Sequence, residues 1–189
     1  MNIPFHIILL DLETNGLDIP EVRITEIGAV RLNEKLNIMD EYSQLVDGRP
    51  VTPHSTSITS ITDAMLEGQP TFEQVLPKFA EWVGKSKSYI LSSWGTYFDI
   101  SVLRSECRRV RVKYPFHGAA LDVKAVALWT TWKDGFKGGP ATRCGVDSAC
   151  KLFGVEFKGT RHRALDDAKA EAMILQKVAR LDDRKESKP

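Results

Sequence analysis

Two carboxylates stand two residues apart near the start of the chain, just after an apolar run. Asp11 and Glu13 follow residues 7–10, Ile-Ile-Leu-Leu, a pattern typical of a strand buried on both faces. Because side chains alternate along a strand, both carboxylates lie on one face, with Cα atoms about 6.5–7 Å apart. Buried like charges repel unless a cation neutralises them, and carboxylate oxygens suit Mg²⁺ and Mn²⁺. The pair indicates either a divalent-metal site or two charges facing water at a strand end.

Two further aspartates lie where a mixed α/β sheet could bring them to the same edge. Asp99 follows an expected strand at 88–93, and sites in open α/β sheets gather at the carboxyl ends of strands. The alternative for Asp99 is a helix-start residue stabilised by the helix dipole. Asp167 lies at the margin of the apolar stripe of an expected C-terminal helix, whereas Asp166 points away from that stripe and is expected to be solvated.

One histidine precedes that C-terminal helix. His162 lies five residues before Asp167, in a lead-in segment that we expect to be mobile. A histidine beside a metal site can take a proton from water near neutral pH, which is the task of a general base in hydrolysis. The alternative is simple exposure to solvent. Lys158, Arg161 and Arg163 surround this histidine and could contact the phosphates of a short single strand.

The whole chain has the composition of an ordinary globular protein. Its 189 residues suffice for one domain with a substantial core, and they are 42% hydrophobic and 27% charged. The net charge of +1 excludes the global basic field of a protein that coats a duplex. Cys107, Cys144 and Cys150 lack CxxC spacing and no signal peptide precedes them, which predicts reduced thiols in a cytoplasmic protein. No apolar run reaches the roughly 20 residues of a membrane span.

The elements that must position these groups form a strand-rich first part and an alternating second part. Apolar patterns predict strands at 7–10, 21–32, 38–46, 88–93 and 119–123, the first three joined by short connections as an antiparallel meander. Helices are predicted at 71–83, 99–110, 124–132, 147–153 and 164–181, with a polar loop at 50–60 and a glycine-rich flexible loop at 133–143. This order predicts one α/β domain over 1–181, a mixed sheet flanked by helices, and a charged, flexible tail at 182–189.

Three motifs together resemble those of the DEDDh 3′–5′ exonucleases, a DnaQ-like group of the ribonuclease-H-like superfamily. They are Asp11-Leu12-Glu13-Thr14, Phe98-Asp99 with Leu103, and His162 through Asp167, in the family's order. Residues 93–97 and 157–162 are most similar to the Eri-type and KapD-type exonucleases. The resemblance implies a ribonuclease-H-like fold, a five-stranded mixed sheet whose first three strands are antiparallel, and this agrees with the order of elements above.

The resemblance also implies roles for individual residues. The metal ligands would be Asp11, Glu13, Asp99 and Asp167, with His162 as the general base. Two Mg²⁺ or Mn²⁺ ions would then support hydrolysis from the 3′ end of single-stranded RNA or DNA, RNA being favoured, with nucleoside 5′-monophosphates as products. Substrate contacts would come from Thr14, Leu17, Ile61, Trp94 and Tyr97. Either Leu17 or Ile61 would be an apolar wedge under the terminal base. The alternative for both residues is ordinary packing.

Two other functions stay open at this point. A ribonuclease-H-like endonuclease would use the same acidic cluster, but the histidine five residues before Asp167 speaks against it. A non-catalytic nucleic-acid-binding module would be expected to have lost a metal ligand, and all four are present. Proofreading-type exonucleases carry His-Asn where this chain has Trp94-Gly95, which leaves the choice of substrate open.

Overall fold

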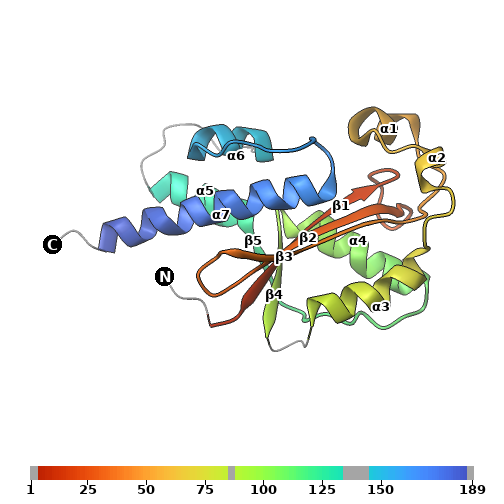
Figure 1. Ribbon diagram of the computed structural model, residues 1–189, viewed down its shortest axis with the longest axis horizontal. Helices are drawn as coiled ribbons and strands as arrows, with labels where there is room; N and C mark the ends of the chain where they lie inside the picture. Colours follow the sequence, from red (N-terminus) through yellow and green to blue (C-terminus); the bar gives the residue numbers. More distant parts are fainter. Residues whose placement is uncertain (1–3, 85–87, 134–144, 187–189) are drawn as a thin grey trace.

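The computed structural model describes residues 4–84, 88–133 and 145–186, which form a five-stranded mixed sheet with helices on both faces (Figure 1). The strands are β1 (His6–Thr14), β2 (Ile24–Leu32), β3 (Ile38–Leu45), β4 (Tyr89–Ser93) and β5 (Ala120–Asp122). Their order is β3-β2-β1-β4-β5, with β1, β2 and β3 antiparallel and with β4 parallel to both β1 and β5. The predicted mixed sheet with an antiparallel first part is confirmed.

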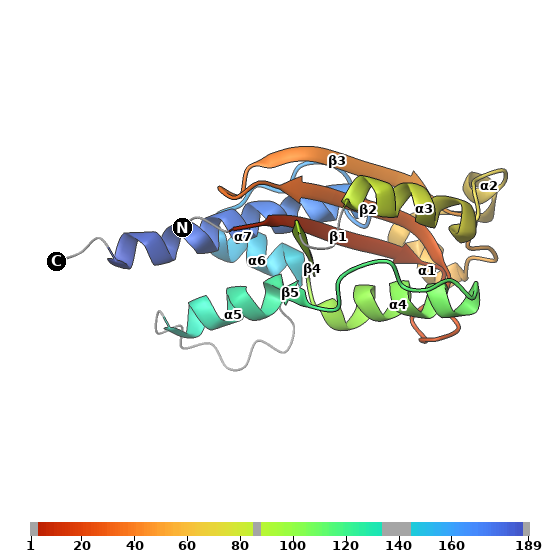
Figure 2. The same cartoon turned by 90° about the horizontal axis from the view of Figure 1, so that it is seen from below.

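The helices divide between the two faces of this sheet (Figures 1 and 2). They are α1 (Pro53–Thr59), α2 (Asp63–Leu66), α3 (Phe72–Val83), α4 (Thr96–Arg109), α5 (Val123–Lys133), α6 (Val146–Phe153) and α7 (Ala164–Glu186). Side chains of α3 and α4 pack on one face, and those of α7 pack on the other. Side chains of α5 and α6 form a further apolar cluster against α7.

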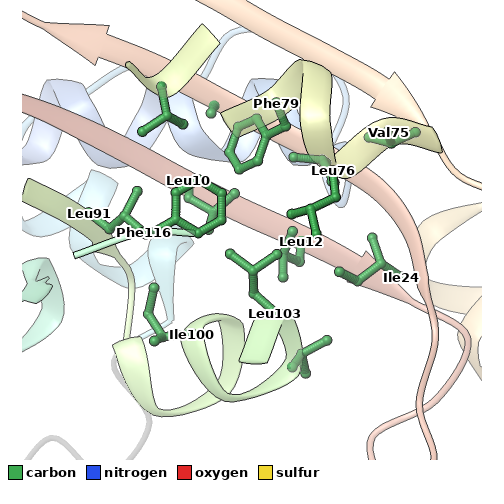
Figure 3. Packing of buried hydrophobic residues seen from close by; sticks show 14 of the residues in the cluster. Leu10, Leu12, Ile24, Val75, Leu76, Phe79, Leu91, Ile100, Leu103 and Phe116 are labelled. Carbon is green, nitrogen blue, oxygen red and sulfur yellow. The ribbon is translucent and has the colours of Figure 1, made fainter. Parts of the chain in front are cut away.

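The central strand β1 is apolar on both sides because both of its faces are covered. Leu10 and Leu12 point to the face that carries α3 and α4, where they join a cluster that includes Phe79 (Figure 3). Leu9 points to the opposite face and packs in a cluster with Leu175 of α7. The alternation along β1 therefore separates two cores, and it also decides which helix the acidic residues at the end of the strand will meet.

The polar segment 50–60 is not the loop that we predicted, because it contains α1, and α2 follows it. The helix α1 begins after Thr52, whose side chain accepts a hydrogen bond from the Ser55 backbone N–H at 3.1 Å. Pro53 occupies the start of the helix, where a missing N–H costs nothing. The helix ends at Ser60, which adopts a left-handed conformation with φ 61°. Serine and threonine capped a short helix here instead of forming an extended loop.

Two helix boundaries also differ from the predictions. The helix α4 begins at Thr96, so that Asp99 lies within its first turn. The helix α7 continues to Glu186, beyond the boundary at Leu181 where a flexible tail was expected. The glycine-rich loop falls almost wholly on residues 134–144, which lie outside the described residues. Among the residues that the structure describes, no helix is long and apolar enough to cross a membrane.

A glycine in β2 lets α7 approach the sheet closely. A Cβ atom built on Gly28 would lie 2.1 Å from both the Ala164 carbonyl carbon and the Leu165 backbone nitrogen. Gly28 is also paired with Asp11 in the register of β1 and β2. Only a residue without a side chain allows the start of α7 to lie against the part of the sheet that holds the acidic pair.

We expect Gly28→Ala to destabilise the protein by about 1–3 kcal/mol or more, because backbone atoms of α7 must move away from the new methyl group. Urea unfolding followed by circular dichroism would measure this change. The matched control is Gly118→Ala, because a Cβ atom there meets nothing within 4 Å. The control should shift stability by under about 1 kcal/mol. Equal stability of the two variants would contradict the close contact.

Candidate active site

The first part of the site is the carboxyl end of β1. Asp11 and Glu13 continue the row of side chains that includes Leu9, so they face the side of the sheet on which α7 packs. Glu13 is buried, with 9% of its surface exposed. Because β1 runs unbroken to Thr14, both carboxylates project from one face of the sheet, as predicted.

The second part comes from the start of α4. The pairing of β1 with β4 ends at Leu9 and Ser92, while β1 itself continues to Thr14. This leaves backbone groups of β1 unpaired on that side, and the Leu12 N–H donates to Asp99 Oδ1 at 3.3 Å. This hydrogen bond places Asp99 at the end of β1, where its side chain is buried. The divergence of two parallel strands provides the space in which ligand sites of such sheets form.

The third part is the segment that leads into α7. Asp167 is buried and accepts a hydrogen bond from the His162 backbone N–H at 2.8 Å. His162 is exposed and adopts a left-handed conformation with φ 58°. Asp166 is not simply solvated as predicted, because it is half-buried and accepts from the Thr160 N–H at 2.8 Å. Both aspartates thus fix the shape of the segment that carries the histidine.

A half-buried ion pair between Arg163 and Glu26 anchors this segment to β2. Glu26 is 1% exposed and accepts two hydrogen bonds from Arg163, at 2.7 Å from Nη2 and 3.0 Å from Nε. The same carboxylate accepts from the Ala164 N–H at 3.1 Å. Arg163 therefore binds Glu26 through two of its guanidinium nitrogens, a contact that its position in the sequence did not suggest. Sequence reasoning missed this role of Glu26, although an acidic residue in a mostly apolar strand was the signal.

These parts surround a pocket of about 400 Å³, a size typical of small-ligand sites. The five predicted catalytic residues all line it, namely Asp11, Glu13, Asp99, His162 and Asp167. The pocket also receives Thr14, Leu17 and Trp94 from the predicted set of substrate contacts.

Two predicted substrate-contact residues do not line this pocket. Ile61 is fully buried and leaves no surface for a ligand. Its neighbour in sequence Ile58, on α1, lines the pocket with 40% of its surface exposed. The error arose because α1 was not foreseen, so the facing of individual residues in this segment was unknown. Tyr97 is 84% exposed on α4 and also lies outside the pocket lining.

The carboxylates of the site are only partly compensated by positive charge, because Arg163 acts on Glu13 and Arg161 on Asp167 while burial and neighbouring acids outweigh both. Burial, followed by the charge of Asp167, raises the pKa of Glu13 from 4.5 to about 8. Burial raises the pKa of Asp99 to about 7, although the hydrogen bond from the Leu12 N–H lowers it. The pKa of Asp11 is raised well above 3.8 by burial and by neighbouring carboxylates. Protons or cations must therefore neutralise the site near neutral pH.

The donor atoms fit a hard divalent cation. Glu13, His162 and Asp167 each offer one ligand atom, and these atoms lie within 4.8 Å of one another. Asp11 and Asp99 add carboxylate oxygens to the same pocket. A site made mostly of oxygen donors is typical of Mg²⁺ or Mn²⁺, and less so of softer ions that select thiolates.

In the metal-free protein we expect the free energy of unfolding to fall as pH rises from about 5 to about 8. Glu13 and Asp99 hold protons in the folded protein that the unfolded chain releases nearer pH 4, so folding loses stability as pH increases. Each such group lowers stability by at most about 1.4 kcal/mol per pH unit. Urea unfolding in EDTA at several pH values would measure the slope. A slope of the opposite sign would show that other groups dominate.

A further buried acid, Glu171, lies on α7 one turn beyond Asp167, and sequence reasoning missed it. It is fully buried, and its pKa is raised well above 4.5 by burial and then by Asp99 and Asp167. The signal was available, because position 171 lies between Ala168 and Leu175 in the apolar stripe of the helix.

Comparison with known proteins agrees with this geometry. The family model described as Exonuclease (RNase_T) matches residues 8–175. The PolC-type DNA polymerase III of Clostridium perfringens is 33% identical over 171 residues, which are 89% of this chain and 11% of that protein. The chain therefore spans about a tenth of the length of this relative. The epsilon subunit of DNA polymerase III from Aquifex aeolicus is 31% identical over 172 residues, which are 90% of this chain and 79% of that subunit.

A solved structure with the same fold is the nuclease domain of 3′hExo, a DEDDh family member bound to rAMP. It matches with a TM-score of 0.75 and 24% sequence identity, over 94% of this chain and 92% of that domain. The predicted ribonuclease-H-like architecture is thereby confirmed. The finer similarity to Eri-type and KapD-type enzymes stays a prediction. Since the family model and the epsilon subunit match most of its length, the chain belongs to the exonuclease family.

Proposed function

We propose that this protein is a metal-dependent 3′–5′ exonuclease that releases nucleoside 5′-monophosphates from single-stranded nucleic acid. The observation that carries the proposal is the convergence of Asp11, Glu13, Asp99, Asp167 and His162 on one pocket. Buried carboxylates with raised pKa values and a histidine beside them are the groups that phosphodiester hydrolysis requires.

The chain's own residues have separate tasks in this reaction. Two divalent ions, Mg²⁺ or Mn²⁺, would supply charge stabilisation and a more acidic water. The carboxylates of Asp11, Glu13, Asp99 and Asp167 would hold them. His162 would take a proton from the water whose oxygen forms the new bond to phosphorus. The bond between phosphorus and the 3′ oxygen of the preceding nucleotide would break, and that oxygen would take a proton from solvent, which balances the one that His162 accepts.

Exposed aliphatic residues beside the pocket support a strand end as the proposed substrate. Leu17 and Ile58 are pocket-lining aliphatic residues with 65% and 40% of their surfaces exposed. Exposed aliphatic side chains beside a polar pocket suit the face of an unpaired terminal base. Trp94 also lines the pocket. We infer that Leu17 and Ile58 contact the terminal base, in place of the pair Leu17 and Ile61.

We propose RNA as the preferred substrate, with DNA also accepted. The motifs around Trp94 and His162 support RNA through their resemblance to Eri-type enzymes, and the structurally similar 3′hExo domain was solved with rAMP. The Aquifex relative is named as a DNA polymerase subunit, which supports activity on DNA. Both substrates therefore belong in the test.

The test compares single-stranded RNA and DNA of one sequence, each labelled at the 3′ end, with Mn²⁺, with Mg²⁺ and with EDTA. We expect labelled mononucleotide to appear first, faster from RNA, and no release in EDTA. Circular single-stranded DNA is the matched control, because it has no end and should stay intact.

Internal fragments, or cutting of the circle, would instead indicate an endonuclease. Binding of the oligonucleotides without any hydrolysis would indicate a non-catalytic module. Activity that persists in EDTA would contradict the metal-dependent mechanism.

A further inference from the structure

The carboxyl group of Glu171 on α7 is fully buried and poorly compensated within the described part of the molecule. It is 0% exposed, and neither of its oxygens has a hydrogen-bond partner among the described residues. The backbone N–H of Trp94 is near enough to favour its charged form, but only weakly against burial. Burying an acid in this state costs several kcal/mol of folding free energy, so its presence calls for a role outside the fold itself.

The surroundings of Glu171 are acidic and not basic. The side-chain charges that act most strongly on it are those of Asp99, Asp167 and Asp122, all of the same sign. In return, Glu171 is the charged group with the largest effect on Asp11. Another buried acid near this site, Glu26, has Arg163 as its partner. A purely structural carboxylate is expected to resemble Glu26, whereas Glu171 shares its surroundings with the proposed metal ligands.

The position of Glu171 on α7 explains how it meets them. Asp167 and Glu171 are four residues apart, so they lie on the same side of the helix, toward β1. Glu171 is absent from the lining of the pocket, while Asp11 and Asp99 line it. Glu171 is therefore fully buried beside these two aspartates without contributing to the pocket surface, so it can act on a bound ion but not touch a substrate.

We propose that Glu171 is a fifth carboxylate of the divalent-ion centre, which increases cation affinity. This inference rests on the proposed metal-dependent function. It assigns α7 two acidic side chains one turn apart toward the ions, Asp167 in the pocket lining and Glu171 outside it. A divalent ion would compensate the cluster of like charges that the chain's own cations compensate only in part.

The test measures Mn²⁺ binding by isothermal titration calorimetry, without substrate, in the full chain and in Glu171→Gln. Glutamine keeps the shape and removes the charge. We expect the affinity for Mn²⁺ to fall about 10- to 100-fold, as is typical when a supporting group of a metal site is lost. The rise in Tm on adding Mn²⁺ should shrink, while the Tm in EDTA should be equal or higher. The matched control is Glu34→Gln, an exposed residue of the β2–β3 turn, which should behave as wild type.

Glu171→Leu provides a second variant of similar volume if the buried amide impairs folding. Unchanged Mn²⁺ affinity in a folded variant would overturn the inference. Failure of both variants to fold in EDTA would also overturn it, since the carboxyl would then be required by the fold. If the wild-type protein itself binds no Mn²⁺ and releases no mononucleotide, the proposed function fails. If the wild type does both and Glu171→Gln binds Mn²⁺ equally well, only the role of Glu171 fails.

Discussion

Asp11→Asn is expected to reduce hydrolysis by on the order of 10³-fold or more while leaving the fold intact. A bound divalent ion contributes several kcal/mol of transition-state stabilisation, and every 1.4 kcal/mol corresponds to about tenfold in rate. Asp11 is the site residue that Glu171, Asp99, Glu13 and Asp167 all affect. Removing its charge relieves this repulsion, so the Tm in EDTA should be equal to or higher than that of wild type.

The measurement combines release of mononucleotides from a 3′-labelled strand with thermal unfolding in EDTA. The control is Asp40→Asn on β3, because Asp40 accepts a hydrogen bond from Trp82 that asparagine can preserve. The control should keep wild-type activity. Full activity of a purified Asp11→Asn protein would exclude Asp11 as a metal ligand. The same pattern of lost activity and retained fold is expected for Asp167→Ala, although this change also removes the acceptor of the His162 N–H.

His162→Asn is expected to lower kcat by about 10²- to 10⁴-fold, the usual contribution of a general base. Asparagine is the appropriate replacement because it tolerates the left-handed conformation that His162 adopts at φ 58°. Its backbone N–H can still donate to Asp167, so the lead-in to α7 should keep its shape.

Affinity for Mn²⁺ distinguishes a base from a ligand. His162 lies within 4.8 Å of ligand atoms of Glu13 and Asp167, so it could in principle bind the ion directly. As a base, it should leave Mn²⁺ affinity nearly unchanged on substitution while altering the pH dependence of kcat. As a ligand, its loss should weaken Mn²⁺ binding together with activity. Calorimetry and a pH–rate profile on the same variant separate the two roles.

The parts of the fold that could be predicted are those in which local sequence decides the outcome. The run before Asp11 is buried on both faces and reads directly as a central strand, and the short connection after Leu32 requires an antiparallel partner. The acids at positions 11, 13, 99 and 167 were found because each lies at an element end or on a helix margin. The family resemblance then assigned them to one site, and the pocket contains all of them.

The parts that could not be predicted depend on contacts between distant segments. Glu26 and Arg163 are 137 residues apart, and nothing in their local patterns pairs them. Glu171 lies in an apolar stripe where a charge should not occur, but its acidic neighbours come from other elements. Ile61 was predicted to contact the substrate but is buried, and Ile58 lines the pocket instead. This could not be predicted because a serine- and threonine-rich segment can be either a loop or a capped helix. Its choice depends on contacts such as the one from the Ser55 hydroxyl to the Thr14 carbonyl.

The hydrogen bond from the Ala164 amide to Glu26 makes the packing of α7 on the sheet measurable by amide hydrogen exchange. First-turn amides have no partner inside their own helix and ordinarily exchange with solvent quickly. The Ala164 amide is instead buried against β2, so its deuterium exchange requires α7 to separate from the sheet. The exchange rate of this one amide thus reports whether the helix that carries Asp167 and Glu171 is packed on the sheet. It does so in variants that bind no metal and turn over no substrate.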